Sequence, residues 1–299
     1  MASNALQRSE PVAIGLVVVG ATFHYLGPSF AVLLFAHLDP MGVAWLRMAS
    51  AAAVLAAIRP PGRAWRAAGR EERLLVVALG AVLAGMNAGF YLALDRLPLA
   101  TVAGIEFLGV IVLAAYGART RRNALALALT VAGVALLVEV RIAGTPAGLA
   151  LAVANCVGFM LYVVLGHRLA TTSRSSVLDR LSLVVAVGAL FATPFGIAAA
   201  APAAGHPAWL LWGVGVGVCS TVIPYLTDQL AMARLPRATY SLLLALLPVT
   251  ATVCGVVLLR QLPGVQDLAG LALVVAGVAA HRSREAVRES ERPKDAVPA

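Results

Sequence analysis

The residues with the most chemical potential are a few polar side chains that interrupt otherwise apolar stretches. Glu106 stands inside the run that follows Pro98, and Asn87 and Tyr91 stand four residues apart in the run before it. A carboxylate in the middle of a membrane segment costs roughly 2.5–3.5 kcal/mol on insertion scales, so it should face a cavity or a partner. Glu106 could therefore carry a proton or bind a substrate amine. The other interpretation is a structural carboxyl group hydrogen-bonded to a neighbouring helix.

Two pairs of polar residues have helical spacing. Asn87 and Tyr91 share one helical face because residues four apart are neighbours on a helix. Asn155 and Tyr162, seven residues apart, share a face of another helix in the same way. Both faces could line a polar cavity, and hydrogen bonds between helices would explain the amides equally well.

Further candidates lie near prolines in apolar surroundings. His24 and Tyr25 precede Pro28, and Tyr225 follows Pro224 directly. Histidine is the side chain that titrates most readily near neutral pH, although a neutral, hydrogen-bonded histidine is the more common case. Pro224 lacks an N–H and frees a backbone carbonyl, which predicts a hinge or a broken helix there.

Arg47 is the other charge inside an apolar run, eight residues after Asp39. Long basic side chains near a helix end can extend toward the interface. The sequence favours a structural anchor or a partner for a carboxylate over direct contact with a substrate.

The elements that must position these residues are membrane helices. Of the 299 residues, 61% are hydrophobic and only 12% are charged, whereas soluble domains have about 25% charged residues. The apolar residues form runs near the spanning length of roughly 17–25 residues. The sequence therefore predicts an all-α membrane protein. Ten spans are predicted, at 12–35, 40–58, 74–94, 98–116, 123–140, 146–166, 177–199, 208–230, 238–259 and 264–281.

The basic residues predict the orientation of these spans. Nineteen of the 23 fall on one side of the predicted membrane, three on the other, and Arg47 lies within a span. Because loops rich in arginine and lysine stay in the cytoplasm, both termini are predicted to be cytoplasmic. The net charge of +9 is accounted for by these loops and their contact with anionic lipid, not by nucleic acid.

The chain contains two internal repeats. Arg96–Thr101 returns as Arg234–Thr239, and Val131–Ala135 returns as Val275–Ala279. Because each half holds five predicted spans, an odd number, the second half enters the membrane from the opposite side. The sequence thus predicts two inverted five-helix repeats at 12–140 and 146–281, followed by a cytoplasmic tail at 282–299. Many secondary transporters have this architecture and bind substrate between the halves.

Signatures of enzymes and metal sites are missing from the sequence. It has no phosphate-binding glycine loop with its lysine, no His-Glu-x-x-His and no nucleophile elbow. The cysteines, Cys156, Cys219 and Cys254, lie in apolar runs with no metal-binding spacing. We therefore expect no enzyme activity, no cofactor and no metal.

Several motifs together resemble a known family. They are Gly85-Met86-Asn87, Phe90-Tyr91-Leu92, Pro98, Glu106-Phe107, Arg47, Ser220-Thr221, Pro224-Tyr225 and Leu235-Pro236. With these the chain resembles the EamA-type ten-helix exporters of the drug/metabolite transporter superfamily, most closely the bacterial threonine/homoserine exporter branch. Leu247-Pro248 departs from the Glu-Pro that such exporters commonly have. Arg260-Gln261 likewise departs from their usual Gly-Glu.

The resemblance implies a bacterial inner-membrane exporter of small metabolites that works by alternating access. It implies that Glu106, Asn87 and Tyr91 line a central cavity with His24, Tyr25, Asn155, Tyr162 and Tyr225. The expected partners are a small-molecule substrate and the lipid bilayer. Proton coupling stays open, as does the choice between monomer and homodimer. A multidrug or toxic-compound exporter is the main alternative, and a membrane-embedded enzyme or a non-transporting scaffold is a third.

Overall fold

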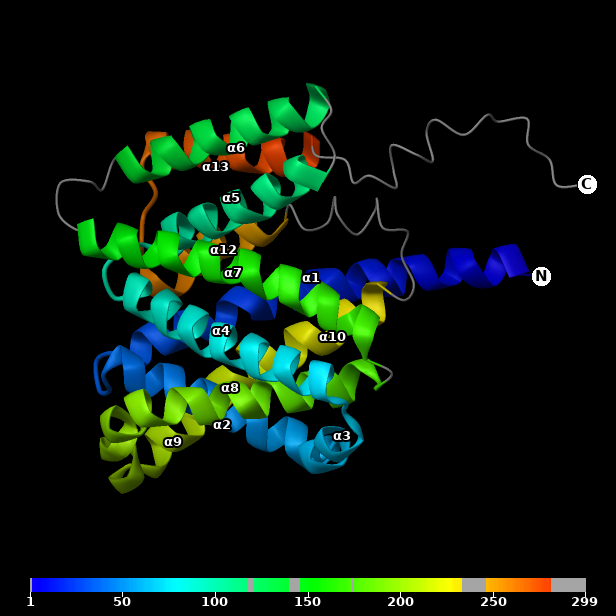
Figure 1. Ribbon diagram of the computed structural model, residues 1–299. Coiled ribbons are helices and arrows are strands. Elements are labelled where there is room, and N and C mark those ends of the chain that lie inside the picture. The colour runs from blue at the N-terminus through cyan, green and yellow to red at the C-terminus, as the bar shows by residue number, and fades with distance from the viewer. Residues whose placement is uncertain (1, 118–120, 140–145, 174, 233–245, 281–299) are drawn as a thin grey trace, which may run out of the picture.

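The protein is built from helices packed side by side. The computed structural model describes residues 2–117, 121–139, 146–173, 175–232 and 246–280 (Figure 1). The helices are α1 (Ala2–Leu34), α2 (Pro40–Ile58), α3 (Pro61–Ala67), α4 (Arg70–Leu94), α5 (Leu99–Gly117), α6 (Arg121–Glu139), α7 (Pro146–Thr172), α8 (Val177–Ala200), α9 (Pro207–Gly217), α10 (Ile223–Met232), α12 (Leu246–Leu259) and α13 (Val265–Ala280). A 3-10 turn, η1 (Ala201–Gly205), precedes α9, and a π-helical turn, η2 (Val218–Val222), joins α9 to α10. The prediction of an all-α protein is confirmed.

Six helical segments are long and apolar enough to cross a membrane. They are Gly15–Leu34, Pro40–Ile58, Arg70–Leu94, Pro146–Gly166, Val177–Gly205 and Pro207–Thr227. Shorter apolar helices, at Leu99–Gly109, Ala124–Leu136, Val249–Leu259 and Val265–Gly277, occupy the other predicted spans. The multi-pass membrane character is therefore confirmed, and ten crossings stay a prediction. The Arg234–Thr239 repeat, the first part of the span predicted at 238–259 and the 282–299 tail lie outside the described residues.

Local sequence signals set many of the helix starts. Pro40, Pro146 and Pro207 each stand at the first position of a helix, where the missing N–H of proline costs nothing. Before α2, the Asp39 carboxylate accepts a hydrogen bond from the Met41 N–H at 2.8 Å, which satisfies one of the otherwise unpaired N–H groups of the first turn.

Two helices extend further than the spans predicted from apolar runs. α1 begins at Ala2 rather than near residue 12, and α7 continues to Thr172 rather than ending near 166. The reason is that the hydrophobic run measures the thickness of hydrocarbon, whereas the helical backbone bonds itself internally and continues into the polar interface. The short α3, at the same end of the molecule as the start of α1 (Figure 1), was not predicted at all.

The helices pack in neighbouring pairs. The most extensive contacts join α6 to α13, α2 to α8, and α4 to α7. α6 and α13, which lie together at the top of Figure 1, carry the two copies of the Val-Ala-Gly-Val-Ala repeat. α1 contacts α9, η2, α10 and α12, and α2 contacts α4, α8, α9 and η2. This packing brings α1, α2, α4 and η2 around one interior region.

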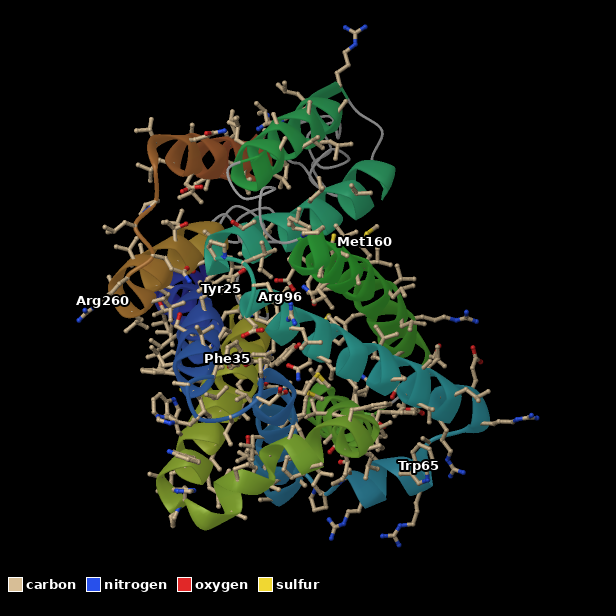
Figure 2. The ribbon with its side chains drawn as sticks, turned by 90° about the vertical axis from the view of Figure 1, so that its left-hand side faces the viewer. Tyr25, Phe35, Trp65, Arg96, Met160 and Arg260 are labelled. Atoms are coloured by element: carbon tan, nitrogen blue, oxygen red, sulfur yellow. The ribbon has the colours of Figure 1, made fainter. Side chains whose placement is uncertain are left out.

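The outer surface is apolar, as a lipid-facing surface must be. Leu190, Phe195, Leu211 and Val257 each expose more than two-thirds of their surface. Tyr25, by contrast, lies fully inside, where Figure 2 shows it between the surrounding ribbons. Large apolar side chains on the outside, around an interior that is apolar but holds a few polar residues such as Asn87 and Asn155, fit the bilayer as solvent.

Arg260, exposed after α12 (Figure 2), has a backbone φ of 53°. In this left-handed region a side chain with a Cβ costs roughly 1–2 kcal/mol, and glycine costs little. We expect Arg260→Gly to be more stable than Arg260→Ala by about 1 kcal/mol, measured as thermal unfolding midpoints in detergent. Arg260→Ala is the matched control because it removes the same side chain but keeps the strained Cβ. Equal midpoints for the two variants would show that backbone strain is not the cause.

Candidate functional site

The interior site is centred on the guanidinium group of Arg47, on α2. Its Nε donates to Thr221 Oγ1 at 3.2 Å, one terminal nitrogen donates to Asn87 Oδ1 at 2.9 Å, and the other donates to the Ser220 carbonyl at 3.4 Å. Three segments far apart in sequence, on α2, α4 and η2, are thereby joined. All three acceptors are neutral, so the positive charge of Arg47 is solvated but not neutralised.

The irregular η2 turn explains how Ser220 and Thr221 reach Arg47. Pro224 has no N–H, so the carbonyl four residues before it, that of Ser220, lacks its usual α-helical donor. The segment forms a π-helical turn instead, a feature that is frequent at functional sites. The Ser220 carbonyl accepts from Arg47. The interruption predicted from Pro224 is therefore confirmed, one turn earlier than the proline itself.

A small residue on α1 lets this turn pack deep in the molecule. A Cβ added at Gly27 would lie 2.0 Å from Ser220 Oγ and 2.8 Å from the Ser220 nitrogen. Only glycine leaves room for the backbone of η2 at that distance. Gly27 therefore fixes how closely α1 approaches Ser220, and with it the position of the group that faces Arg47.

Asn87 and Tyr91 hold the other side of Arg47. Asn87 is 3% exposed, and its Nδ2 donates to the Ala44 carbonyl at 3.0 Å while its Oδ1 accepts from Arg47. The Arg47 guanidinium carbon lies 5.6 Å from the centre of the Tyr91 ring, within the range of a cation–π interaction. The prediction that Asn87 and Tyr91 share one helical face is confirmed by their common contact with Arg47.

Glu106 lies on α5 between the buried residues Ile105 and Phe107, yet keeps some accessible surface of its own. One turn later, a Cβ at Gly109 would lie 2.7 Å from the Cys156 sulfur, so α5 and α7 nearly touch there. This close approach brings the Glu106 carboxylate beside Asn155 and within the electrostatic range of Arg47. Asn155 is 1% exposed, and neither of its amide atoms has a hydrogen-bond partner among the described residues.

His24 and Tyr25, on α1, border the same region. Their rings meet edge to face, with centres 5.0 Å apart. His24 lies within the electrostatic range of Arg47, and Tyr25 lies within that of Glu106. α1 therefore lies near both charges; that these residues line one cavity stays a prediction.

Tyr162 and Tyr225 form a separate contact. Their side chains interact with each other, and the Tyr162 ring also stacks near Phe159 with centres 6.3 Å apart. Tyr162 lies about two helical turns from Asn155 on α7, so this aromatic pair belongs to a different level of the bundle from Glu106. The structure thus brings together six of the eight predicted site residues and places these two beside one another, one layer away.

The position of Arg47 corrects one expectation. Its side chain does not extend to the interface but is held in the interior by Asn87, Thr221 and the Ser220 carbonyl. Nor does it pair with a carboxylate within 4.0 Å, because the ion pairs among the described residues are Arg96–Asp95 and Arg168–Glu71, both at the surface. Sequence reasoning noticed Arg47 but missed its central place. Ser220-Thr221 before Pro224 marks a polar break in the sequence, but nothing in that motif connects it to Arg47.

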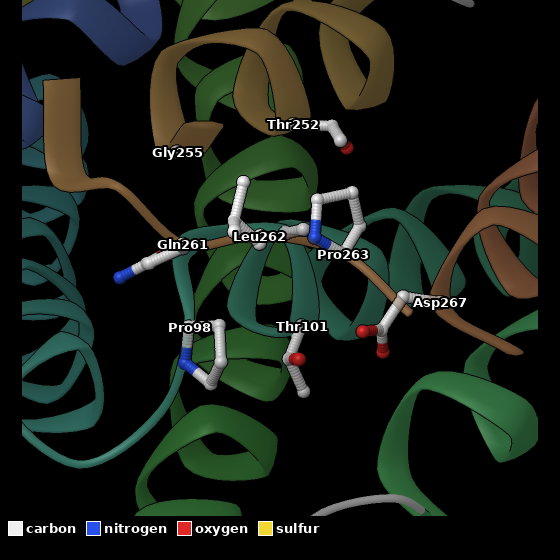
Figure 3. A pocket seen from close by; sticks show the side chains of 9 residues that line it. Pro98, Thr101, Thr252, Gly255, Gln261, Leu262, Pro263 and Asp267 are labelled. Carbon is white, nitrogen blue, oxygen red and sulfur yellow. The ribbon is translucent and has the colours of Figure 1, made fainter. Parts of the chain in front are cut away.

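Two hollows in the described part of the structure lie away from Arg47 and Glu106, and neither of these two residues lines them. A small one of about 30 Å³ lies between the starts of α5 and α13 and the end of α12, lined by Pro98, Thr101, Gln261 and Asp267 among others (Figure 3). There Gln261 Oε1 accepts from the Leu99 N–H at 3.2 Å and caps α5. A larger groove of about 580 Å³ between α3, α4 and α8 is lined by apolar residues such as Trp65 and Phe195, as expected of a lipid-facing surface.

The chain is similar to known transporters over most of its length. The EamA-like transporter family model matches residues 146–281. The threonine/homoserine exporter RhtA of Salmonella typhimurium strain SL1344 is 31% identical over 283 residues, covering 91% of this chain and 92% of that protein. The exporter of the same name from Escherichia coli K12 is 29% identical over 279 residues, with the same coverage of both chains.

The fold has a counterpart among solved structures. One crystal structure of a protein superposes on 95% of this chain and 100% of its own with a TM-score of 0.55, at 20% sequence identity. At that identity the likeness concerns the fold alone. The helical arrangement around Arg47 and Glu106 therefore belongs to a fold that has been observed experimentally.

Proposed function

Because this chain belongs to the EamA-like transporter family, we propose that it exports small amino acids, such as threonine and homoserine, across the bacterial inner membrane. It is a multi-pass membrane transporter and not an enzyme. The names of its relatives support this choice of substrate, since RhtA from two bacteria matches nearly the full length of the chain.

One observation carries the proposal. Glu106 and Arg47, opposite charges on α5 and α2, face the same interior region and feel each other electrostatically without forming an ion pair. Charged groups inside a membrane bundle are costly and mark substrate or ion pathways. A carboxylate inside the bundle, without an ion-pair partner among the described residues, is suited to bind the ammonium group of an amino acid. In this proposal Glu106 contacts the amine, and Asn87, Tyr91, His24, Tyr25 and Asn155 shape its surroundings.

The architecture that we propose is two inverted five-helix repeats, 12–140 and 146–281, with both termini and the 282–299 tail in the cytoplasm. Three features support it: the family model covers 146–281, the repeated segments of α6 and α13 lie against each other, and basic residues favour one side of the predicted membrane. Export then proceeds by alternating access, with the two halves rocking about the site. In this proposal the Tyr162–Tyr225 pair lies one layer away from the site.

The function is tested by an efflux assay. Cells of a bacterial strain with low background export, expressing the protein, are fed a threonine-containing dipeptide, and each amino acid is followed outside the cells. We expect threonine or homoserine to appear faster than from cells with an empty vector. The same assay with a protonophore tests coupling to protons, with the cellular energy level measured in parallel.

Two outcomes would contradict the proposal. Efflux equal to that of vector cells for every amino acid would exclude amino-acid export. Resistance to unrelated toxic compounds, in the absence of amino-acid efflux, would support a drug exporter with the same fold instead.

A further inference from the structure

The buried polar atoms without partners are concentrated around Arg47 and Glu106. Within the described part of the chain they are the hydroxyls of Tyr25, Tyr91 and Ser220, both amide atoms of Asn155 and the indole nitrogen of Trp212. More than 90% of buried polar groups in proteins have a hydrogen-bond partner, so such atoms call for an explanation. All of them except that of Trp212 belong to residues that border one of the two interior charges.

Around Arg47 the unpaired groups are hydrogen-bond donors. The guanidinium group has five N–H bonds, and three of them have partners among the described residues. One N–H on each terminal nitrogen remains. The Tyr91 hydroxyl lies close to both Arg47 and Ser220, and neither the Tyr91 nor the Ser220 hydroxyl has a hydrogen-bond partner among the described residues. Two guanidinium N–H bonds on an uncompensated positive charge, with the Tyr91 hydroxyl beside them and the Ser220 hydroxyl next to Tyr91, match the two oxygens of a carboxylate.

Around Glu106 several acceptors are available, beside the Asn155 Nδ2 donor that lies next to the carboxylate. The Glu106 carboxylate, the Asn155 amide oxygen and the Tyr25 hydroxyl oxygen lie close together, and the last two have no partner within the described ranges. An ammonium group has three N–H donors and no acceptor. Three acceptors with one negative charge are therefore the chemical complement of an ammonium group.

The relative position of Arg47 and Glu106 suggests that one ligand contacts both clusters. Arg47 and Glu106 interact through space, yet they form no ion pair within 4.0 Å. Two opposite charges in a membrane interior gain from contact, and this pair forms no ion pair among the described residues. A molecule that carries an anion and a cation on neighbouring atoms would bridge them, and an α-amino acid is the simplest such molecule.

We propose that Arg47, Tyr91 and Ser220 form a subsite for the substrate carboxylate, opposite Glu106, Asn155 and Tyr25, which take the ammonium group. This inference rests on the proposed function and deepens it, because it makes the site specific for zwitterions. Asn87 and Thr221 are positioning residues that aim the guanidinium. The substrate side chain is left outside both clusters, so discrimination among amino acids falls to other residues.

The test is a comparison of ligands on the purified, full-length protein in lipid nanodiscs. Affinities are measured by calorimetry for threonine, for threonine amide, which lacks the carboxylate, and for 2,3-dihydroxybutyrate, which lacks the amine. Wild-type protein should bind both analogues at least about tenfold more weakly than threonine, because each loses charge-assisted hydrogen bonds. Arg47→Gln should weaken threonine binding by about tenfold or more and leave the affinity for threonine amide unchanged.

Controls separate this role from a structural one. Arg96→Gln is a matched change at an exposed arginine that pairs with Asp95, and it should alter neither affinity. If Arg47→Gln does not fold, Tyr91→Phe and Ser220→Ala test the carboxylate subsite instead. Each removes one hydroxyl donor, so each should weaken the binding of threonine but not of threonine amide.

The outcomes distinguish this inference from the function it rests on. Equal losses for threonine and threonine amide in these variants would assign Arg47 to positioning and overturn the subsite, while amino-acid transport stands. Wild-type protein that binds threonine no better than threonine amide would overturn the subsite directly. Wild-type protein that binds none of the three ligands would overturn the proposed function and the subsite with it.

Discussion

Replacing Glu106 with glutamine is expected to abolish amino-acid export while the protein remains in the membrane at its normal level. Glutamine has nearly the same shape but no negative charge, so the substrate ammonium would lose its counter-charge in a region of low dielectric constant. A charge-assisted hydrogen bond contributes about 1.5–3 kcal/mol, which corresponds to a reduction of roughly tenfold to a hundredfold in apparent affinity. Any proton carried by Glu106 would be lost as well.

The measurement is the rate of threonine efflux normalised to the amount of protein in the membrane fraction. Glu71→Gln is the matched control, because Glu71 is an exposed carboxylate that pairs with Arg168 at 3.5 Å; its export rate should equal that of the wild type. Glu106→Asp, which keeps the charge one methylene shorter, should retain part of the activity. Wild-type efflux in Glu106→Gln would remove this residue from the mechanism.

Asn87→Leu is expected to reduce both stability and export, and a second change at Arg47 should then restore stability alone. Leucine removes one of the three acceptors of Arg47 and the donor to the Ala44 carbonyl, so a buried charge and a buried carbonyl each lose a partner. We expect a loss of about 2–4 kcal/mol in the free energy of unfolding, together with loss of export.

Adding Arg47→Met should then recover most of the stability, because a buried charge with too few partners is replaced by an apolar side chain. The double variant should nevertheless be inactive. Unfolding in sodium dodecyl sulfate, followed by tryptophan fluorescence, gives the stabilities of the four proteins in the cycle.

Thr130→Val serves as the control for this cycle. Thr130 is equally buried, and its hydroxyl bonds within its own helix, to the Ala126 carbonyl at 2.9 Å, so its replacement should cost less than about 1 kcal/mol. A double variant no more stable than Asn87→Leu alone would show that Arg47 is not the cause of the instability.

The sequence was sufficient to predict the helices and several of the interior residues. Apolar runs of spanning length gave α2 at its observed bounds, 40–58, because a membrane permits few alternatives to a helix. Four-residue spacing placed Asn87 and Tyr91 on one face, and both contact Arg47. These features depend on local periodicity, which a single sequence contains.

What the sequence did not reveal depends on contacts between distant segments. Thr221 and Arg47 are 174 residues apart, and no local pattern says that η2 packs on α2. The interior position of Arg47 follows from that packing, so a snorkelling arginine was an equally good reading of α2 alone. Similarly, the meeting of Glu106 with Asn155 depends on how closely Gly109 lets α5 approach α7, which is a property of the assembled bundle.

The partners of Arg47 are far from it in sequence, and this has a consequence for biosynthesis. Asn87 follows Arg47 by 40 residues, but Thr221 follows it by 174. At a translation rate of about 5–20 residues per second, α2 leaves the ribosome roughly 10–35 seconds before η2 exists. During that interval the guanidinium group of Arg47 lacks the hydrogen bonds to Thr221 and Ser220. Water or the translocon must supply its missing partners. The last helices of the nascent chain therefore complete the membrane integration of the second one, and chains that end before η2 should expose α2 to quality-control proteases.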